Sequence, residues 1–337
     1  MKDSLDLTVV ICCYNSASRL PRTLSHLVKQ HNIDGLNWEL LIINNNSPDD
    51  TSSVAAKVWQ ELKTAVPLRI VDEPKAGITA ARKTGVIEAK GEFILFCDDD
   101  NHLSSNYFHE AIRTIRQDSA IAVVAGNGQP AWIAPPPPWI DHCLSFLACK
   151  PQTTVKQDAG VTGFYSAGML ARRQALMEVY QTFDLALSSR SGTKKLGGGE
   201  DLELCLLLSI LGYRLWGNPL LTFGHEIAVE RLNWRYIKSL RFATGVSNAQ
   251  LAPIKFVAQQ KEKNYKSKWA VQLLATMFRV LGFGTRYPFS KHHAMEFWHQ
   301  LGRAKGLLFL RKSYNTRINH LAAIRENSKQ RNVTAVK

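Results

Sequence analysis

The sequence predicts an α/β fold, in which a mostly parallel central sheet is flanked by helices and followed by a basic α-helical C-terminal region. Two observations predict the sheet. Strand-like and helix-like segments alternate through the first half of the 337-residue chain, and most strand-like runs are apolar throughout, as in strands covered on both faces. The third observation is an abrupt rise in positive charge near residue 226, which sets the C-terminal region apart.

The individual elements follow from apolar spacing. Strand-like runs rich in Val, Ile, Leu and Phe predict strands at 7–13, 38–43, 68–71, 93–96 and 121–125. Apolar residues at helical spacing predict helices at 18–30, 51–64, 79–89 and 105–116. A helix between two strands connects them as parallel neighbours, so the carboxyl ends of these strands should lie at one edge of the sheet. Ligands bind at that edge in sheets of this kind.

The middle of the chain is less regular. Residues 132–139 contain four consecutive prolines flanked by tryptophans, and we expect a stiff extended loop there. An apolar strand-like run occupies 220–223. Further helices are predicted at 173–180, 200–211, 269–282 and 296–310.

The charge is divided unevenly along the chain. Residues 1–225 carry 21 Lys and Arg and 23 acids, whereas residues 226–337 carry 21 Lys and Arg and only five acids. We therefore expect a sheet domain over 1–225 and a basic helical region over 226–337. That region is an ordinary helical subdomain packed on the sheet, a surface that binds anionic lipid head groups, or both. No nucleic-acid-binding motif is found, so no nucleic-acid partner is expected.

Cysteine usage and hydropathy bear on location. Six cysteines occur without a CxxC pair, and most lie in apolar runs where buried free thiols are expected, which favours a reducing compartment. No N-terminal signal is apparent, and no run reaches the ~18 apolar residues of a membrane span. The expected location is the cytoplasm, either free or bound peripherally to the cytoplasmic face of a membrane.

Three consecutive acids at 98–100 directly follow a predicted strand. Like charges repel and resist burial, so the segment is either a solvated acidic turn or a divalent cation site. Carboxylate oxygens suit Mn²⁺ or Mg²⁺, with substrate phosphates completing the shell. Tyr14 and the asparagines at 44–46 follow two other predicted strands, so the three segments can converge on one crevice.

Five short motifs occur in order within residues 6–225. They are the strand at 9–15, the strand and turn at 39–51, Gly77 with Ala81, Arg82 and Gly85, the acids Asp98, Asp99 and Asp100, and Gly199-Glu200-Asp201. In these motifs the chain resembles glycosyltransferase family 2, whose members are inverting sugar transferases with the Rossmann-like GT-A fold. The resemblance implies a nucleotide-sugar half over about 1–125 and an acceptor half over about 126–225.

For the metal site, the resemblance implies roles at the acidic motif. Asp100 would coordinate a Mn²⁺ or Mg²⁺ ion that bridges the donor diphosphate, and Asp98 would bind the donor's ribose or support the metal. His225 would be a further metal ligand; the alternative is a hydrogen-bonded histidine at a strand end.

For the nucleoside, the resemblance implies contacts from Tyr14, Asn15 and Asn45, while Arg82 would face the nucleotide. The alternative for Arg82 is a surface helix charge. The family usually has an acid near position 44 or 45, able to accept a hydrogen bond from a uracil N–H. An asparagine carbonyl can still accept that bond, although the departure leaves the identity of the base open.

On the acceptor side, Asp201 would be the catalytic base and Glu200 would contact the acceptor or orient its loop. The alternative for both acids is charge stabilisation at a helix N-terminus. Lys194, in a glycine-rich loop, would approach the diphosphate or an anionic acceptor, unless it is merely solvated. Trp139 would stack on a sugar, unless it packs locally.

The resulting expectation is an inverting, metal-dependent glycosyltransferase. It would move a sugar from a nucleotide donor, expected to be a UDP-sugar, to a glycan or lipid-linked acceptor in cell-surface polysaccharide synthesis. Two alternatives are a sugar-nucleotide nucleotidyltransferase and a non-catalytic, transferase-like membrane adaptor. The glycine-free segment after the first strand counts against the former, and the intact Asp98, Asp100 and Asp201 count against the latter.

Overall fold

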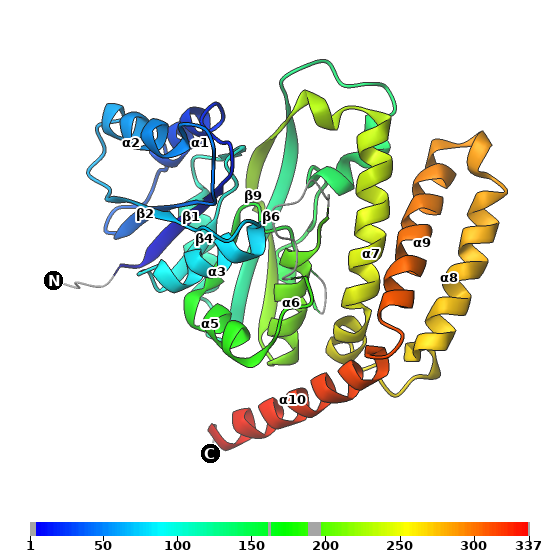
Figure 1. Ribbon diagram of the computed structural model, residues 1–337. Helices are drawn as coiled ribbons and strands as arrows, with labels where there is room; N and C mark the ends of the chain where they lie inside the picture. The colour runs from blue at the N-terminus through cyan, green and yellow to red at the C-terminus, as the bar shows by residue number, and fades with distance from the viewer. Residues whose placement is uncertain (1–4, 161–162, 188–196, 336–337) are drawn as a thin grey trace.

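The computed structural model describes residues 5–160, 163–187 and 197–335. Within these residues a nine-stranded sheet has the strand order β3-β2-β1-β4-β8-β6-β9-β5, with β7 paired to β9. Helices cover both faces of the sheet, and a bundle of longer helices lies beside it (Figure 1). The predicted α/β fold with a helical C-terminal region is confirmed.

The first half of the sheet is parallel. Its strands are β1 (Leu7–Cys13), β2 (Trp38–Asn44), β3 (Leu68–Asp72) and β4 (Phe93–Phe96). Alternate residues of β1 enter different cores, with Val10 on one face and Val9 and Ile11 on the other. A strand buried on both faces is apolar at nearly every position, which explains the run that predicts it. The exception, Thr8, is buried and donates a hydrogen bond to Glu39 at 2.9 Å.

The second half mixes strand directions. It contains β5 (Asn101–Leu103), β6 (Ile121–Trp132), β7 (Gln157–Asp158), β8 (Met169–Arg172) and β9 (Arg214–Ile227). β8 is antiparallel to β4 and β6, while β6 and β9 run parallel over most of their length. Both long strands extend well past the runs at 121–125 and 220–223 that predict them.

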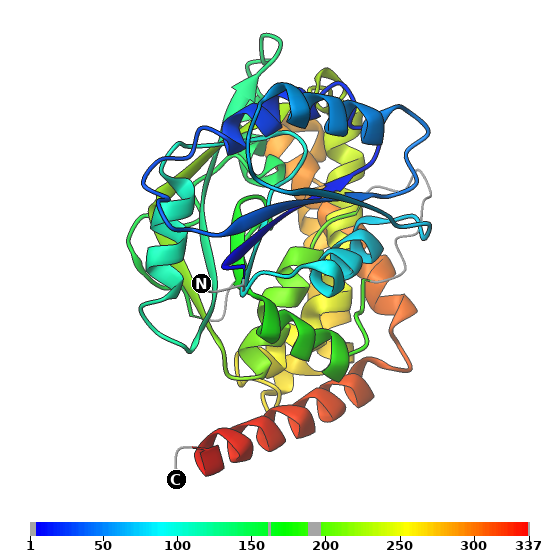
Figure 2. The same ribbon diagram turned by 90° about the vertical axis from the view of Figure 1, so that its left-hand side faces the viewer.

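Two layers of helices sandwich the sheet. Helices α1 (Leu20–Leu27), α2 (Thr51–Glu61) and α4 (Tyr107–Ile115) cover one face. Helices α3 (Ile78–Glu88), α5 (Arg173–Thr182) and α6 (Glu200–Ile210) cover the other. Figure 2 shows the two layers on either side of the strands.

The C-terminal region is helical, as predicted. It contains α7 (Trp234–Ala258), α8 (Trp269–Gly284), α9 (Lys291–Phe309) and α10 (Tyr314–Ala335). Short 3-10 turns are η1 (Ile140–Leu147), η2 (Val229–Arg231), η3 (Tyr265–Ser267) and η4 (Tyr287–Phe289). No helix among the described residues is both long and apolar enough to traverse a bilayer.

Packing continues across the change of charge at residue 226. Ile254 of α7 and Leu321 of α10 belong to the same buried cluster as Val10 of β1. Strand β9 itself ends at Ile227, and α10 crosses the end of the bundle against α7 and α6 (Figures 1 and 2). The basic helices therefore share the core of the sheet domain.

Candidate active site

The parallel strands deliver the candidate residues to one edge. Tyr14 follows β1, Asn45 follows β2, and Asp98 lies just beyond β4, and all three strands point the same way. The three segments therefore lie at the carboxyl edge of the sheet, where ligands bind in folds of this kind.

Asp99 holds the acidic turn against α1. Its carboxylate accepts a hydrogen bond from Arg19 Nη2 at 2.5 Å and another from the Ser16 hydroxyl. The Thr23 hydroxyl donates to the Asp99 backbone carbonyl at 2.8 Å. Because protein groups already bind its carboxylate, Asp99 fixes the position of the acidic turn.

Asp98 carries a carboxyl group that burial makes costly to ionise. Burial, together with the charges of Asp100 and Asp99, raises its pKa to about 6, although the positive charge of Arg82 opposes the rise. The turn is tied to the next strand, since the Asp98 backbone N–H donates to Asn101 Oδ1 at 3.0 Å. A bound cation would relieve the repulsion among these carboxylates.

Strand pairing places His225 against Asp100. Asn101 of β5 lies opposite His225 of β9, and His225 Nε2 lies 3.4 Å from Asp100 Oδ2. Burial alone would lower the pKa of His225, but the hydrogen bonds to Asp100 and Cys149, together with the negative charges of these two groups, outweigh burial and raise that pKa to about 10. Burial would raise the pKa of Asp100, but the hydrogen bond from His225 and the positive charges of His225, Arg231 and Arg19 together lower it.

Two further groups surround this pair. Arg231 of η2 places Nη1 3.4 Å from His225 Nε2 and 3.9 Å from Asp100 Oδ2. On the other side of the imidazole, Nδ1 lies 3.9 Å from the sulfur of Cys149. Positive charge from His225 and Arg231 thus faces the carboxylate of Asp100.

The donor chemistry of this pair fits a divalent cation. A carboxylate oxygen and an imidazole nitrogen are ligands that Mn²⁺ accepts, and substrate phosphates supply further oxygens. Within the described ranges no three His, Cys, Asp or Glu side chains form a ready-made metal site. Asp100 and His225 can therefore hold an ion only as part of a shell, and the proton on His225 must first leave.

Asp201 lies in the first turn of α6, after Gly199, whose φ of 110° is readily adopted only by glycine. Its Oδ2 accepts the backbone N–H of Ser166 at 3.1 Å, and its Oδ1 accepts the N–H of Leu202 at 3.0 Å. These bonds fix the carboxylate and leave lone pairs on both oxygens.

Arg82 joins the two groups of carboxylates. Its guanidinium is buried and donates to the hydroxyl of Ser166, whose backbone binds Asp201. The same guanidinium lies near enough to Asp98 to lower the pKa of that acid. Ser166 precedes β8, and Met169 of β8 pairs with Phe96 of β4. The acidic turn and Asp201 are thus linked through two side chains at one edge of the sheet.

The nucleoside-side residues divide into exposed and buried positions. Tyr14 is exposed, and Asn15 adopts a positive φ of 51°. Asn45 is buried, and its amide donates to the carbonyls of Glu73 and Lys75 at 2.9 and 2.8 Å. Its Oδ1 accepts the N–H of Gly77 at 2.7 Å. Asn45 therefore shapes the loop before α3, and its contact with a base stays a prediction.

A carboxylate from a different strand, that of Asp72, lies beside the predicted nucleoside-binding asparagines. The Asn44 amide donates to Asp72 Oδ1 at 2.9 Å, because Asp72 ends β3 beside Asn44 at the end of β2. The sequence has no acid at 44 or 45, but the fold supplies a carboxylate next to those positions.

The residues predicted to lie on the acceptor side are in three different environments. Trp139 packs edge-on against Trp234 at 5.6 Å between ring centres, with Lys291 Nζ 4.9 Å from the Trp139 ring. Glu200 is buried at the start of α6. Lys194 lies outside the described residues. Sugar stacking by Trp139 and acceptor contacts by Glu200 stay predictions.

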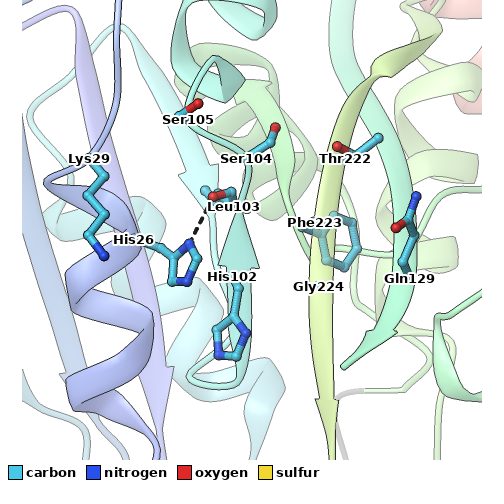
Figure 3. Close-up of a pocket in the computed structure, with 10 residues that line it drawn as sticks. All are labelled: His26, Lys29, His102, Leu103, Ser104, Ser105, Gln129, Thr222, Phe223 and Gly224. Atoms are coloured by element: carbon cyan, nitrogen blue, oxygen red, sulfur yellow. Dashed lines mark hydrogen bonds between the residues drawn. The ribbon is translucent and has the colours of Figure 1, made fainter. Parts of the chain in front are cut away.

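A cavity of about 290 Å³ lies beside the acidic turn, between α1, β5, β6 and β9 (Figure 3). The His26 and His102 rings stack with centres 4.9 Å apart, and His102 Nε2 lies 3.7 Å from Glu226. The cavity is lined by His26, Lys29, His102, Leu103, Ser104, Ser105, Gln129, Thr222, Phe223 and Gly224. None of the carboxylates proposed for the active site lines this cavity, so the cavity is a neighbour of the site and not part of it.

Comparison with known proteins identifies the class. Residues 8–180 match the profile described as glycosyl transferase family 2, which is slightly more than half of the chain. The dolichol-phosphate mannosyltransferase of Pyrococcus furiosus is 28% identical over 120 residues, which are 35% of this chain and 32% of that protein. The first curated relatives are matched over about a third of their length. The chain belongs to glycosyltransferase family 2.

Solved structures agree on the fold. The mannosyltransferase PcManGT from Pyrobaculum calidifontis, in complex with GDP-Man and Mn²⁺, has a TM-score of 0.55 at 18% identity, covering 91% of this chain and 88% of that one. S. aureus TarS 1-349 in complex with UDP-GlcNAc has a TM-score of 0.53 at 13% identity, covering 97% and 92%. The fold is that of the GT-A glycosyltransferases.

Several residues of the site carry no signal in the sequence. Ser166 lies in a run of small and apolar residues, and Arg231 is one of many cations after residue 226. Arg19 follows the first strand like any surface arginine. Their positions depend on pairing between strands far apart in the sequence, which local patterns do not encode.

Proposed function

We propose that the chain is an inverting glycosyltransferase that transfers a sugar from a nucleotide-sugar donor, with Asp201 as the catalytic base. One observation carries the proposal: Arg82 and Ser166 link Asp201 to the acidic turn that contains Asp98. That link supports one cleft with a base on one side and a diphosphate site on the other.

In the proposed reaction the acceptor hydroxyl gives its proton to the Asp201 carboxylate. The acceptor oxygen forms a bond to the anomeric carbon as the bond from that carbon to the diphosphate oxygen breaks. The electron pair of the broken bond leaves with the nucleoside diphosphate. Attack opposite the leaving group inverts the anomeric centre, and no covalent enzyme intermediate is required.

The leaving diphosphate needs positive charge. Protein cations available near Asp100 are Arg231 and His225, and Arg82 lies near Asp98. A Mn²⁺ or Mg²⁺ ion held by Asp100 and His225 would supply a Lewis acid for the phosphate oxygens. Binding of that ion requires loss of the His225 proton, so the imidazole would be a ligand or a cation, never both.

For the donor we propose a UDP-sugar. Asn44, Asn45 and the Asp72 carboxylate provide hydrogen-bond acceptors beside the predicted nucleoside site, and a uracil N–H needs such an acceptor. The two similar structures hold a GDP-sugar and a UDP-sugar, so their fold leaves the base open.

For the acceptor we propose a glycan or a lipid-linked saccharide in cell-surface polysaccharide synthesis, at the cytoplasmic face of a membrane. The name of the Pyrococcus relative includes a lipid phosphate acceptor, although the match covers about a third of that protein. The basic region over 226–337 supports a membrane setting through its charge.

A panel of nucleotides tests the donor site. We expect UDP to raise the melting temperature of the full chain in the presence of Mn²⁺, and GDP, ADP and CDP to raise it less. We also expect UDP-sugars to release UDP in the presence of a saccharide acceptor. Stabilisation by GDP alone would contradict the proposed base, and release of pyrophosphate in place of UDP would contradict the reaction type.

A further inference from the structure

Helix α8 presents an uncovered apolar face. Phe278, Leu281 and Leu274 have exposed fractions of 73%, 65% and 60%, and Met277 is also exposed. These positions recur three, four and seven residues apart, so they lie on one side of the helix. Large apolar side chains gathered on one side of an element mark an interaction surface.

The opposite side of α8 is anchored. Thr276 is buried, Leu273 packs on the main core, and Trp269 Nε1 donates to the carbonyl of Leu307 at 2.7 Å. Helix α8 contacts α9 and forms the outermost layer of the bundle in Figure 1. The exposed face therefore belongs to a helix that is fixed in place, pointing away from the domain.

Positive charge surrounds this face at both ends. Four exposed lysines lie in the eight residues before α8, namely Lys261, Lys263, Lys266 and Lys268. At the other end, Arg279, Arg286 and Lys291 are exposed and lie in or beyond the C-terminal half of α8. Residues 261–291 contain one acid, Glu262, which is paired with Arg325 at 2.7 Å. The apolar face is thus bordered by cations whose charge no further acid of this segment balances.

The length of α8 excludes a spanning arrangement. Its 16 residues extend about 24 Å, less than the ~30 Å of a bilayer's hydrocarbon core. A short helix with one apolar side and flanking lysines and arginines is instead suited to lie along the membrane interface.

We propose that the outer face of α8, with its flanking cations, docks the protein on an anionic lipid bilayer. The apolar side chains enter the boundary between head groups and acyl chains, and the cations bind lipid phosphates. Charge decides against a second copy of this chain as the occupant. Two such faces would bring two sets of cations together, whereas anionic lipids complement them.

The position of the surface bears on the proposed acceptor. Phe289 of η4 is highly exposed and lies two residues before Lys291, whose Nζ is 4.9 Å from the Trp139 ring. The docked end of the bundle therefore adjoins a residue predicted to contact the acceptor. This one step, access to a lipid-linked acceptor, rests on the proposed function, whereas membrane binding itself does not.

Vesicle flotation tests the proposal without donor or acceptor, so its result is independent of catalysis. We expect the full chain to float with phosphatidylcholine vesicles that contain phosphatidylglycerol, and about tenfold less with phosphatidylcholine alone. The double variant Leu274→Glu/Phe278→Glu should reduce recovery at least about tenfold. The matched control is Leu220→Glu/Ile133→Glu, which adds the same charge at exposed apolar positions outside the bundle and should float like the wild type.

Equal recovery with both vesicle types, or no loss in the α8 variant, would overturn the proposal. Sedimentation velocity distinguishes the other occupant. If the wild type is a dimer without lipid and the α8 variant is a monomer, the partner of this face is a second copy of the chain. That result would also overturn the proposal. Circular dichroism of the variants checks that each one is folded, which is expected because the substituted side chains are exposed.

Discussion

The charged groups around Asp100 determine which side chains of the site are protonated when no ligand is bound. His225 is protonated at neutral pH because its pKa is raised to about 10, and Arg231 adds a second positive charge nearby. Asp98 has a raised pKa of about 6 and so ionises only near neutral pH. A metal ion must therefore displace a proton from His225 in order to use its nitrogen.

A pH series tests whether His225 loses a proton when the metal ion binds. Because the pKa of His225 is raised, the imidazole carries a proton throughout the range below about 10, and that proton opposes metal binding. Mn²⁺ affinity should rise about tenfold per pH unit between about pH 6.5 and 8, as one proton leaves for each ion bound. Titration calorimetry in buffers of different ionisation enthalpy measures both the affinity and the released proton.

The conservative variant His225→Gln serves as the control. It should bind Mn²⁺ more weakly and with a shallower dependence on pH, because the amide has no proton to lose in this range. A wild-type affinity that does not change with pH would show that His225 is not a metal ligand.

Among the elements, β6 and β9 do most to assemble the site. Their parallel pairing runs from Ile121 to Trp132 and brings His225 beside the strand that follows Asp100. The register shifts between Ala125 and Asn127. A Cβ at Gly126 would collide with the carbonyl oxygen and Cβ of Leu221, so glycine is required where the two strands approach closely.

Gly126→Ala should therefore destabilise the protein by about 1–3 kcal/mol, because a methyl group is forced into a packed strand pair. Gly282→Ala in α8 is the matched control, since no atom apart from its chain neighbours and the backbone of its own helical turns lies within 4 Å of the position that the new methyl group would take. That control should be neutral or stabilising by up to ~1 kcal/mol. Urea unfolding measures both, and equal stabilities would contradict the close approach of β6 and β9.

The elements that the sequence predicts well are those whose burial follows a simple rule. The runs at 7–13 and 93–96 match β1 and β4, because strands buried on both faces are apolar at nearly every position. Strand β5 is only three residues long, Asn101–Leu103, and forms by pairing with a distant strand. Helix α7 contains Pro253, and local propensity argues against a helix there.

At the residue level, the same contrast holds. Asp98, Asp100, Asp201 and His225 can be proposed from the sequence because they are of chemically distinctive types at strand or helix ends. The role of Asn45 in holding the loop at 73–77 cannot be predicted from the sequence, because its partners are backbone groups of a different segment. Ser166 escapes prediction for the same reason, since its contacts with Arg82 and Asp201 arise only in the folded chain.

In the whole molecule, one fold brings together carboxylates that are about a hundred residues apart in sequence. The acidic turn follows β4, Asp201 begins α6, and Ser166 with Arg82 lies between them. The basic helices share the core of that domain and carry the surface proposed to meet lipid. Both proposals thus depend on a single packed unit in which the proposed donor site, the proposed base Asp201 and the bundle are fixed relative to one another.

Replacement of Asp201 by asparagine tests whether this carboxylate is the base that takes the acceptor proton. An amide oxygen can still accept a backbone N–H bond from Ser166 or Leu202, so the fold and the donor site should persist. We expect Asp201→Asn to lower the rate of sugar transfer about 10²–10⁴-fold. UDP-sugar affinity should stay within about twofold of wild type, and the exposed-acid control Asp34→Asn should be fully active. Transfer at the wild-type rate by Asp201→Asn, or loss of donor binding together with activity, would contradict that role of Asp201.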